Sequence, residues 1–394
     1  MQDTERLQLF AVAGDPISYS LSPTMMNRAM KATDFHGYYM YLAADSVEDI
    51  FNVMTFLEMS GCNITAPFKM SVFEKTNKFD TRVQQTGSVN LIVKQGEEWV
   101  GYNTDVNGVY QSLKEYQADF QACKVLIIGY GGAARAAAYA CKMMEMQKYV
   151  TGKDTDKLEK FAAKTGCIPV DIQDIQQIID RVDVIISTIP KNPLLLNQVT
   201  FGEQQIVLDC SYFNTGLENK VTSRNAFYIS GKKWLLYQGC PAYKMLTTLD
   251  APVEEMTQSL QEENTPPKIF SIISVSEGLL HTVTAHLSEF EQTTFIDLVD
   301  DPCSFRKLKK RIRKAPKQSN IILMATAAEL ENADFYNFMK DETFCFLLVS
   351  GKEKEKEKTL QYIRAVDVLV PTELKTGAQV AARIKKEIEN ICPL

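Results

Sequence analysis

Four short polar motifs within the first 105 residues hold the side chains best suited to chemistry. They are Ser20-Leu21-Ser22-Pro23, Asn63-Ile64-Thr65-Ala66-Pro67-Phe68-Lys69, Gly87-Ser88-Val89-Asn90 and Gly101-Tyr102-Asn103-Thr104-Asp105. Together they supply hydroxyls, carboxamides, one amine and one carboxylate on loops at predicted strand ends. Such a set suits a small ligand that carries several hydroxyl groups and one carboxylate.

Each motif also has a purely structural interpretation. Ser20 or Ser22 could cap the helix that begins at Pro23, and Asp105 could cap the helix that follows it. Taken one motif at a time, these alternatives stay open.

A glycine-rich turn, Gly129-Tyr130-Gly131-Gly132-Ala133-Ala134, is the second chemical signal. It joins residues 124–129 (KVLIIG), a buried-strand pattern, to the Ala-rich helical pattern of residues 133–143. Glycines at such a junction let the backbone approach a pyrophosphate, which the N–H groups of the helix then hold. The turn predicts a dinucleotide site, with a tight turn that binds no ligand as the alternative.

The elements around these motifs predict an α/β protein. An apolar stretch at residues 9–13 precedes a helical pattern at residues 23–32, and strand patterns recur at residues 182–187 and 206–210. After a polar segment at residues 257–267, another strand pattern begins at residue 269. The order indicates an open sheet, a doubly wound nucleotide-binding domain and a third α/β part.

Composition narrows the class of protein. The chain has 394 residues, a formal net charge of -6, 45% hydrophobic residues and 23% charged residues. The length predicts about two or three domains, and the proportions are typical of a soluble globular protein. An acidic balance argues against a nucleic-acid partner. The basic residues 306–317 are predicted to form a helix with one solvated face.

Neither export nor metal binding is expected. The N-terminus carries acids where a signal peptide needs positive charge, and no run of about 18 apolar residues occurs. The nine cysteines form no CxxC pair, and the three histidines lie far from any metal-spaced partner. We therefore expect a reduced, cytoplasmic protein with no metal site and no membrane contact.

In their order along the chain, the polar motifs resemble the substrate signature of the shikimate dehydrogenase family: SxSP, NxTxPxK, xxN and GxNTDxxG. The matching residues are Ser20, Ser22, Asn63, Thr65, Lys69, Asn90, Asp105 and Gly108. The glycine turn resembles the GAGGA turn of that family, residues 209–212 its DxxY strand end, and residues 231–238 its GxxMLxxQ element. The resemblance covers about residues 7–256.

The resemblance implies reversible, nicotinamide-dependent reduction of 3-dehydroshikimate to shikimate, a step of chorismate and aromatic amino acid biosynthesis. It implies that Lys69 gives or takes the proton at the reacting oxygen, while Asp105 bonds that lysine and a substrate hydroxyl. The implied substrate-binding residues are Ser20 and Ser22 for the carboxylate, Thr65, Asn90 and Gln238 for the hydroxyls, and Tyr212 near the carboxylate or the nicotinamide.

NADP is the cofactor that the resemblance implies, with NAD as the alternative. The implied cofactor-binding residues are Gly129, Gly131, Gly132, Ala133, Lys153, Lys157, Gly231 and Trp234. Where NADP-dependent members resemble NRTxxR, this chain has lysines at both arginine positions, which keep the charge but not the bidentate fork. Asp154 and Asp156 would repel a 2′-phosphate, and an acid here commonly binds the ribose of NAD. Trp234 stands where the family has a methionine against the nicotinamide.

The implied architecture has three domains. A substrate-binding domain occupies residues 1–110, with a returning helix near 237–256, and a Rossmann-type domain occupies residues 111–236. Residues 257–267 form a linker, and residues 268–394 form a third α/β domain.

That third domain resembles a shikimate kinase without its catalytic parts. Residues 295–297 resemble part of FIDxD, residues 305–306 its FR segment, and residues 362–370 its YxxxADxVV segment. The phosphate loop GxxxxGK[ST] is absent, because residues 275–281 read VSEGLLH. Val299 replaces an aspartate, residues 325–328 (ATAA) replace a glycine turn, and Arg306 alone survives from the substrate-binding set. Without a phosphate cradle, lysine or Mg²⁺-binding hydroxyl, phosphoryl transfer is not expected.

Several functional alternatives stay open. The third domain could bind another enzyme of the pathway, mediate self-association as a homodimer, or support the dehydrogenase structurally, or it could be an α/β fold unrelated to kinases. The first two domains could form an NAD-using quinate/shikimate dehydrogenase. A non-catalytic binding or regulatory protein of the pathway is the alternative from another class.

Overall fold

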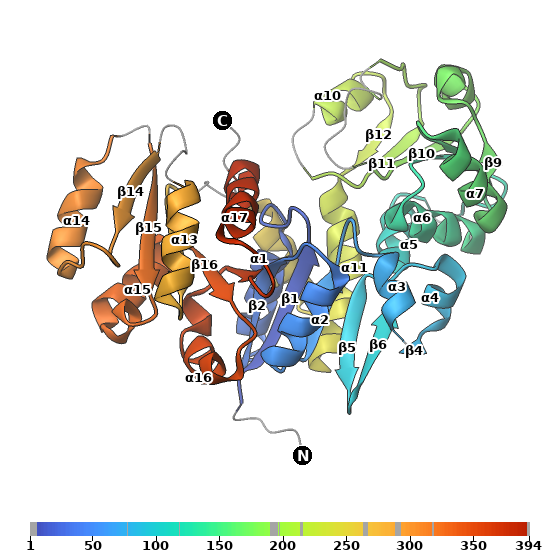
Figure 1. Cartoon of the computed structure of the whole chain (residues 1–394). Coiled ribbons are helices and arrows are strands. Elements are labelled where there is room, and N and C mark those ends of the chain that lie inside the picture. The colour runs from blue at the N-terminus through green and yellow to red at the C-terminus, as the bar shows by residue number, and fades with distance from the viewer. Residues whose placement is uncertain are drawn as a thin grey trace. The chain divides into compact units, whose positions relative to one another are not determined.

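The computed structural model describes residues 6–76, 78–117, 119–189, 196, 198–212, 216–262, 267–287, 293–316 and 319–391. It divides into two compact units (Figure 1). Unit 1 combines Met1–Phe68 with Gln261–Leu394, and unit 2 is Lys69–Leu260. Unit 1 is therefore built from both ends of the chain, and unit 2 from the stretch between them.

Unit 1 contains eight parallel strands among its described residues, in the order β14-β15-β13-β16-β17-β2-β1-β3. Their bounds are β1 Gln8–Gly14, β2 Gly37–Ala43, β3 Gly61–Ile64, β13 Ile269–Ser274, β14 Thr293–Asp297, β15 Asn320–Thr326, β16 Phe344–Val349 and β17 Val368–Pro371. Most are unbroken apolar runs, as expected of parallel strands that are covered on both faces.

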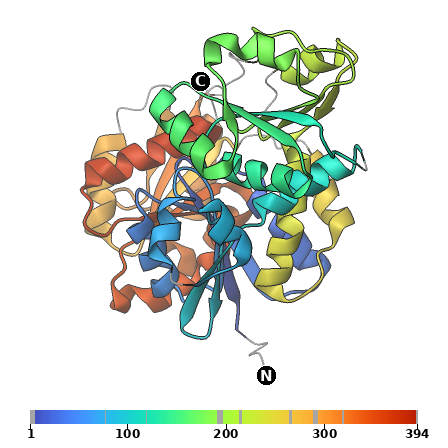
Figure 2. The same ribbon diagram turned by 90° about the vertical axis from the view of Figure 1, so that its right-hand side faces the viewer.

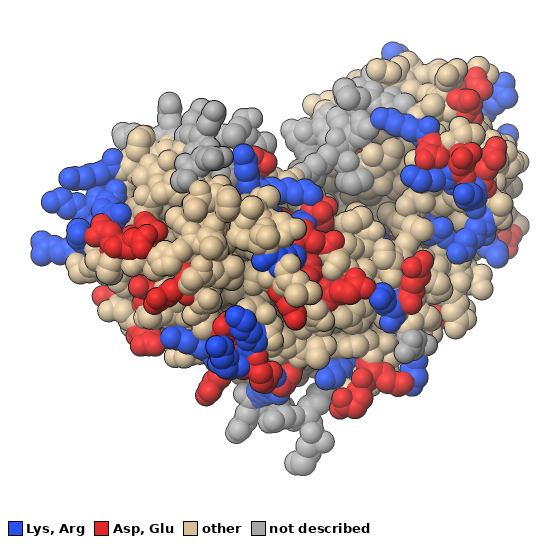
Figure 3. Space-filling model, in the orientation of Figure 1, with Lys and Arg blue, Asp and Glu red and all other residues tan. Residues whose placement is uncertain are grey.

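The connecting helices supply that cover. They are α1 Ser22–Ala32, α2 Val47–Phe56, α13 Glu277–Leu287, α14 Phe305–Lys314, α15 Ala333–Glu342, α16 Glu353–Gln361 and α17 Gly377–Ile391. Helix α17 packs against α13, and Phe305 of α14 stacks near Phe335 and Phe338 of α15. The basic helix predicted from the sequence is α14, whose Leu308 is buried while its Lys and Arg side chains gather on the surface in Figure 3.

One strand pair joins the two ends of the chain into a single sheet. Strand β17 runs parallel to β2, with Val368 opposite Tyr41 and Leu369 opposite Leu42. The Tyr41 N–H donates to the Asp367 carbonyl at 2.9 Å, and the Tyr38 hydroxyl donates to the Val366 carbonyl at 3.0 Å. The predicted division differs here, since residues 268–394 do not form a compact unit apart from the N-terminal strands. The physical reason is that β17 covers the edge of β2, which would otherwise expose unpaired backbone groups.

Unit 2 holds a six-stranded parallel sheet in the order β12-β11-β10-β7-β8-β9, with helices on both sides of it (Figure 2). The strands are β7 Lys124–Ile128, β8 Gln147–Thr151, β9 Ile168–Pro169, β10 Val184–Ser187, β11 Ile206–Asp209 and β12 Phe227–Ile229. Along β7, Val125 and Ile127 enter one hydrophobic core, and Leu126 and Ile128 enter the other. This is the doubly wound arrangement predicted from the sequence.

The helices of unit 2 that matter for function are α5 Asp105–Lys114, α6 Gly132–Met143, α7 Thr155–Thr165 and α11 Gly231–Thr247. Helix α11 packs along α5 as the returning helix, and α12 Val253–Gln261 follows it. Residues 257–261 of the predicted linker are therefore helical, and residues 263–266 lie outside the described part. Unit 2 also holds an antiparallel pair, β5 Leu91–Gln95 and β6 Glu98–Tyr102, beside the short β4 Lys78–Phe79.

None of the helices in the described residues combines the length and apolar character that a bilayer span requires. Nor do three or more His, Cys, Asp or Glu side chains of the described chain gather in a way that could hold a metal ion.

Candidate active site

Lys69 and Asp105 form an ion pair in unit 2. The Lys69 ammonium lies 2.5 Å from Oδ2 of Asp105, and the two side chains are 15% and 7% exposed. Asp105 is the first residue of α5, so its carboxylate is not the N-cap of that helix, which is Thr104. The capping interpretation of Asp105 is therefore wrong. An amine and a carboxylate that are both nearly buried and in contact are suited to holding and moving one proton.

Trp234 engages the other oxygen of the same carboxylate. Its indole N–H donates to Oδ1 of Asp105 at 3.3 Å, and its ring is buried. The ring packs directly against Gly108, where an added Cβ would lie 2.4 Å from the ring carbon Cδ1. The resemblance implies that Trp234 contacts the nicotinamide, and it does not predict the bond to Asp105. In the sequence, the only indication of this contact is Gly108, one turn after Asp105, which leaves room for the Trp234 ring.

Asn90, Gln238 and Thr104 form one hydrogen-bonded network, and the motifs alone assign no role to Thr104. Oδ1 of Asn90 accepts the Thr104 backbone N–H at 2.7 Å, and the Asn90 amide donates to the Thr104 hydroxyl at 2.9 Å and to Gln238 at 3.2 Å. All three residues are buried. The network fixes the start of α5, and with it the position of Asp105.

The glycine turn lies next to Lys69. Gly129 has φ of +111°, a backbone conformation that favours glycine, and an added Cβ there would lie 2.5 Å from the Thr188 hydroxyl. Gly132, the first residue of α6, approaches so closely that an added Cβ would lie 2.8 Å from Cβ of Lys69 and from the Ser88 hydroxyl. The turn and the catalytic candidate are thus in van der Waals contact.

The turn also has the features that a pyrophosphate requires. Gly131 is exposed, with open space among the described atoms within 4 Å of where a Cβ would stand. The N–H groups that open α6, a helix of 12 residues, follow at once, with Ala133 half-buried in its first turn. Backbone without a side chain at a helix N-terminus fits a bound dinucleotide.

The residues after β8 bear on the choice of cofactor. Lys153 and Lys157 are exposed, as a phosphate contact needs. Asp154 caps α7 by accepting the Lys157 backbone N–H at 3.0 Å, and its carboxylate lies 3.3 Å from the Lys157 ammonium. The backbone bond from Lys157 and the lysine charge hold the pKa of Asp154 below its usual value. The Asp154 carboxylate therefore serves as the N-cap of α7.

The end of β11 holds the remaining predicted residues of unit 2. Gly231 packs against backbone, since an added Cβ would lie 2.4 Å from the Cys210 carbonyl oxygen. Tyr212 is half-buried, and the residues 213–215 that follow it lie outside the described part. Asp209 is buried, and burial raises its pKa to about 6 despite hydrogen bonds from Ser211 and other neighbours.

Ser20, Ser22 and Thr65 lie in unit 1, at the carboxyl ends of its strands. The Ser20 hydroxyl donates to the Ser22 hydroxyl at 3.2 Å and accepts the Ser22 backbone N–H at 3.2 Å. Helix α1 begins at Ser22, its N-cap is Leu21, and neither serine acts as the cap. Two neighbouring hydroxyls of this kind can both donate to a carboxylate oxygen.

Two tyrosines of β2 support this region and were missed at the sequence level. The Tyr41 hydroxyl donates to the Ser20 carbonyl at 2.9 Å, and the Tyr39 hydroxyl donates to Oδ1 of Asn63 at 2.8 Å. Thr65 continues β3 and donates its N–H to the Ala13 carbonyl at 2.9 Å. Tyr39 and Tyr41 alternate along a strand, a spacing that was the only available signal.

Known proteins with similar sequences match the first two thirds of the chain. Residues 12–92 match the family described as shikimate dehydrogenase substrate binding domain, and residues 111–206 match shikimate / quinate 5-dehydrogenase. The shikimate dehydrogenase (NADP(+)) of Aquifex aeolicus is 27% identical over 263 residues, which cover 65% of this chain and 97% of that protein. The enzyme of the same name from Streptococcus pneumoniae is 28% identical over 284 residues, 65% of this chain and 97% of that protein.

Solved structures give the same result. The crystal structure of the Aquifex aeolicus shikimate dehydrogenase superposes with a TM-score of 0.61 at 26% identity, covering 66% of this chain and 99% of that one. A shikimate dehydrogenase in complex with NADP+ superposes with a TM-score of 0.58 at 25% identity, covering 65% and 95%. Residues 12–92 and 111–206 are therefore similar to the two domains of shikimate dehydrogenases, a family of NAD(P)-dependent oxidoreductases that act on a CH–OH group.

Proposed function

We propose that the protein is a shikimate dehydrogenase that catalyses the reversible, NADP-dependent reduction of 3-dehydroshikimate to shikimate. One observation carries this proposal: the Lys69–Asp105 pair, at 2.5 Å, lies against the glycine turn through Gly132. A proton-transfer pair beside a dinucleotide turn is what ketone reduction needs. The names of the relatives, shikimate dehydrogenase (NADP(+)), support the choice of substrate and cofactor.

The chain's own residues account for the proton and for substrate orientation. When bound, NADPH supplies the hydride that adds to the ketone carbon. Lys69 gives a proton to the ketone oxygen and takes one back from the hydroxyl in the reverse direction. Asp105 holds Lys69 in place and bonds the substrate hydroxyl, while Trp234 fixes the carboxylate from its other side.

The remaining residues bind. In this proposal Ser20 and Ser22 hold the substrate carboxylate. The substrate hydroxyls are held by Thr65, Asn90 and Gln238, and Tyr212 lies near the carboxylate or the nicotinamide. Gly129, Gly131, Gly132 and Ala133 would hold the pyrophosphate, with Gly231 and Trp234 near the nicotinamide. Lys153 and Lys157 would bind the 2′-phosphate. This role is supported by the hydrogen bond that engages Asp154 as the N-cap of α7, since that carboxylate is then occupied within the protein.

Steady-state oxidation of shikimate with NADP and with NAD tests the proposal, with quinate as a second substrate. We expect turnover with NADP, and Lys69→Ala should lower kcat by about 10²–10⁴-fold, the usual contribution of a positioned acid or base. Lys94→Ala, at an exposed lysine of unit 2, is the matched control and should match wild type.

Three outcomes would contradict parts of the proposal. Absence of turnover with either cofactor favours the non-catalytic, regulatory alternative. Preference for NAD together with use of quinate favours the quinate/shikimate dehydrogenase. Full activity of Lys69→Ala removes the assigned proton donor.

We propose further that residues 268–394 form a shikimate-kinase-like fold without a phosphate loop. The strand order supports it, because β13, the first strand of the segment, lies between β15 and β16. Only Val275 and Ser276 separate β13 from α13, and the exposed Glu277 opens that helix. After β15, Glu329 accepts the N–H and hydroxyl of Thr326 at 2.7 and 2.6 Å. The two-residue connection is too short for a phosphate loop, and the carboxylates of Glu277 and Glu329 would repel a triphosphate.

A further inference from the structure

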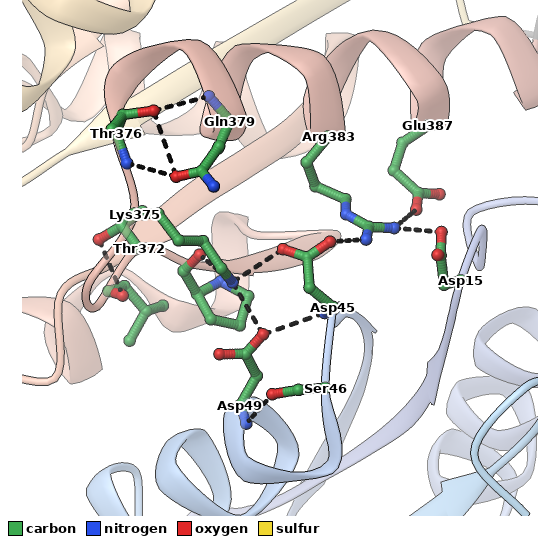
Figure 4. A network of polar contacts seen from close by, with 12 residues as sticks. Asp15, Asp45, Ser46, Asp49, Thr372, Lys375, Thr376, Gln379, Arg383 and Glu387 are labelled. Atoms are coloured by element: carbon green, nitrogen blue, oxygen red, sulfur yellow. Dashed lines mark hydrogen bonds and ion pairs between the residues drawn. The ribbon is translucent and has the colours of Figure 1, made fainter.

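The C-terminal helix α17 contacts the loop between β1 and α1, which carries Ser20 and leads into Ser22, within unit 1. Figure 4 shows Arg383 of α17 paired with Asp15 of that loop. Helix α17 spans Gly377–Ile391, and the loop runs from Asp15, after β1, to Leu21, before α1. Arg383 and Glu387 lie one turn apart on α17 and are 7% and 0% exposed. Two charged side chains buried this deeply require partners, and the loop provides them.

Glu387 holds the middle of the loop. Its Oε2 accepts the backbone N–H of Ile17 at 3.0 Å, the backbone N–H of Ser18 at 2.9 Å and the Ser18 hydroxyl at 2.8 Å. Three donors on one carboxylate oxygen fix both the path and the direction of the backbone there. Hydrogen bonds to an ionised group are about twice as strong as neutral ones.

Arg383 holds the ends of two neighbouring strands. Its guanidinium pairs with Asp15, which follows β1, and with Asp45, which follows β2 (Figure 4). Lys386 also reaches Asp15, at 2.6 Å. Burial alone would raise the pKa of Asp15, but the hydrogen bonds and charges of Arg383 and Lys386 hold it below its usual value.

A second contact secures the entry to the helix. The Lys375 ammonium, just before α17, lies 2.9 Å from Asp45 and 2.8 Å from Asp49 of α2. Asp49 in turn accepts the Asp45 backbone N–H at 3.0 Å. The C-terminal segment thus contacts the residues that follow β1 and β2 through several charged side chains, and not through one surface ion pair.

The position of Ser20 follows from that of Ile17. The Ser20 backbone N–H donates to the Ile17 carbonyl at 2.9 Å, and the Ser20 hydroxyl then bonds Ser22. Only Ser18 and Tyr19 lie between Ile17, whose N–H Glu387 accepts, and Ser20. A shift at Ile17 is therefore passed to both hydroxyls.

We propose that Glu387 and Arg383 are positioning residues of the substrate site, which hold the loop so that Ser20 and Ser22 are preset for the substrate carboxylate. The inference rests on the proposed function for the identity of that substrate. In this proposal the C-terminal segment needs no ligand of its own, because its helix α17 positions the loop that binds the substrate.

The test compares Glu387→Ala with Glu389→Ala in the full-length protein. Glu389 lies on the same helix, is exposed, and lies 3.9 Å from the Lys385 ammonium. In Glu387→Ala, KM for shikimate should rise by about tenfold or more, since the loop would lose the three hydrogen bonds that preset it and would have to be ordered on binding. KM for NADP and kcat should stay within about twofold, and Glu389→Ala should match wild type.

Hydrogen exchange gives a readout that does not depend on catalysis. The amides of Ile17 and Ser18 should exchange at least about tenfold faster in Glu387→Ala than in wild type. Glu387→Gln keeps an oxygen acceptor and should restore part of both effects. This milder variant also carries the test if Glu387→Ala fails to fold.

The outcomes separate the two proposals. If wild type oxidises no shikimate, the proposed function fails, and exchange at Ile17 and Ser18 alone decides whether Glu387 holds the loop. Unchanged exchange overturns the inference, and so does faster exchange with an unchanged KM for shikimate. A fall in kcat with an unchanged KM would show that the contact acts on stability or chemistry and would also overturn it.

Discussion

Replacing Gly132 by alanine should disable the active site by pushing on Lys69 from the cofactor turn. An alanine Cβ would lie 2.8 Å from Cβ of Lys69 and 3.1 Å from its Cδ, whereas ordinary contacts begin at 3.4 Å. Lys69 must therefore move by about 0.6 Å or more, because the competing atoms belong to the first residue of a helix, which cannot yield freely. The ion pair with Asp105, at 2.5 Å, would be lengthened by a similar amount.

The expected result is a fall in kcat of about ten- to a hundredfold, since a displacement of about 1 Å in a catalytic group can cost 10²-fold. The assay is shikimate oxidation at saturating NADP, with thermal unfolding in parallel. Gly131→Ala is the informative contrast: with open space at its Cβ position, it should raise KM for NADP while kcat at saturation is retained. Gly278→Ala, on α13 and also in open space, controls for the substitution itself. Equal kcat in Gly132→Ala and wild type would refute the reasoning that contact with the turn sets the position of Lys69.

Two further predictions concern the neighbourhood of this pair. Trp234→Phe removes the N–H donor to Asp105. This variant should lower kcat by about tenfold, the value of one hydrogen bond to a charged group, with KM for NADP little changed. An unaltered kcat would show that the bond has no catalytic consequence. For Asp209, burial raises the pKa to about 6 in the folded protein, so folding favours the protonated form, and stability falls as pH rises from about 4 to about 6. Asp209→Asn removes this dependence and should gain about 3 kcal/mol relative to wild type between pH 4 and pH 7, measured by urea unfolding; a difference that is equal at both pH values would contradict it.

The sequence predicted the parts of the site that depend on local geometry. A strand feeding a glycine turn and an Ala-rich helix has few structural solutions, and β7, the turn and α6 occur within one residue of the expected bounds. Motif order alone predicted Lys69 and Asp105 as the catalytic residues; their side chains form an ion pair, and their catalytic roles stay a prediction. The predicted roles of Ser20, Ser22 and Tyr212 in binding remain predictions.

What could not be predicted are pairings between segments distant in sequence. Nothing in the local pattern of β17 shows that its partner is β2, because any short run of Val and Leu can pair with any exposed edge. Likewise Glu387 looks like an ordinary charged residue of an amphipathic helix until its three donors are seen. Trp234 was assigned by analogy with a methionine, which has no N–H to donate, so its bond to Asp105 had no counterpart in the pattern.

The pairing of β17 with β2 also sets the order of events during synthesis. Strand β2 leaves the ribosome early, but its neighbour Val368 follows more than 300 residues later, which at ~5–20 residues per second means a wait of roughly 16–65 s. Unit 2 is translated entirely within that interval. Until β17 emerges, the edge of β2 lacks its partner strand, so a chain released before Val368 keeps an open sheet edge.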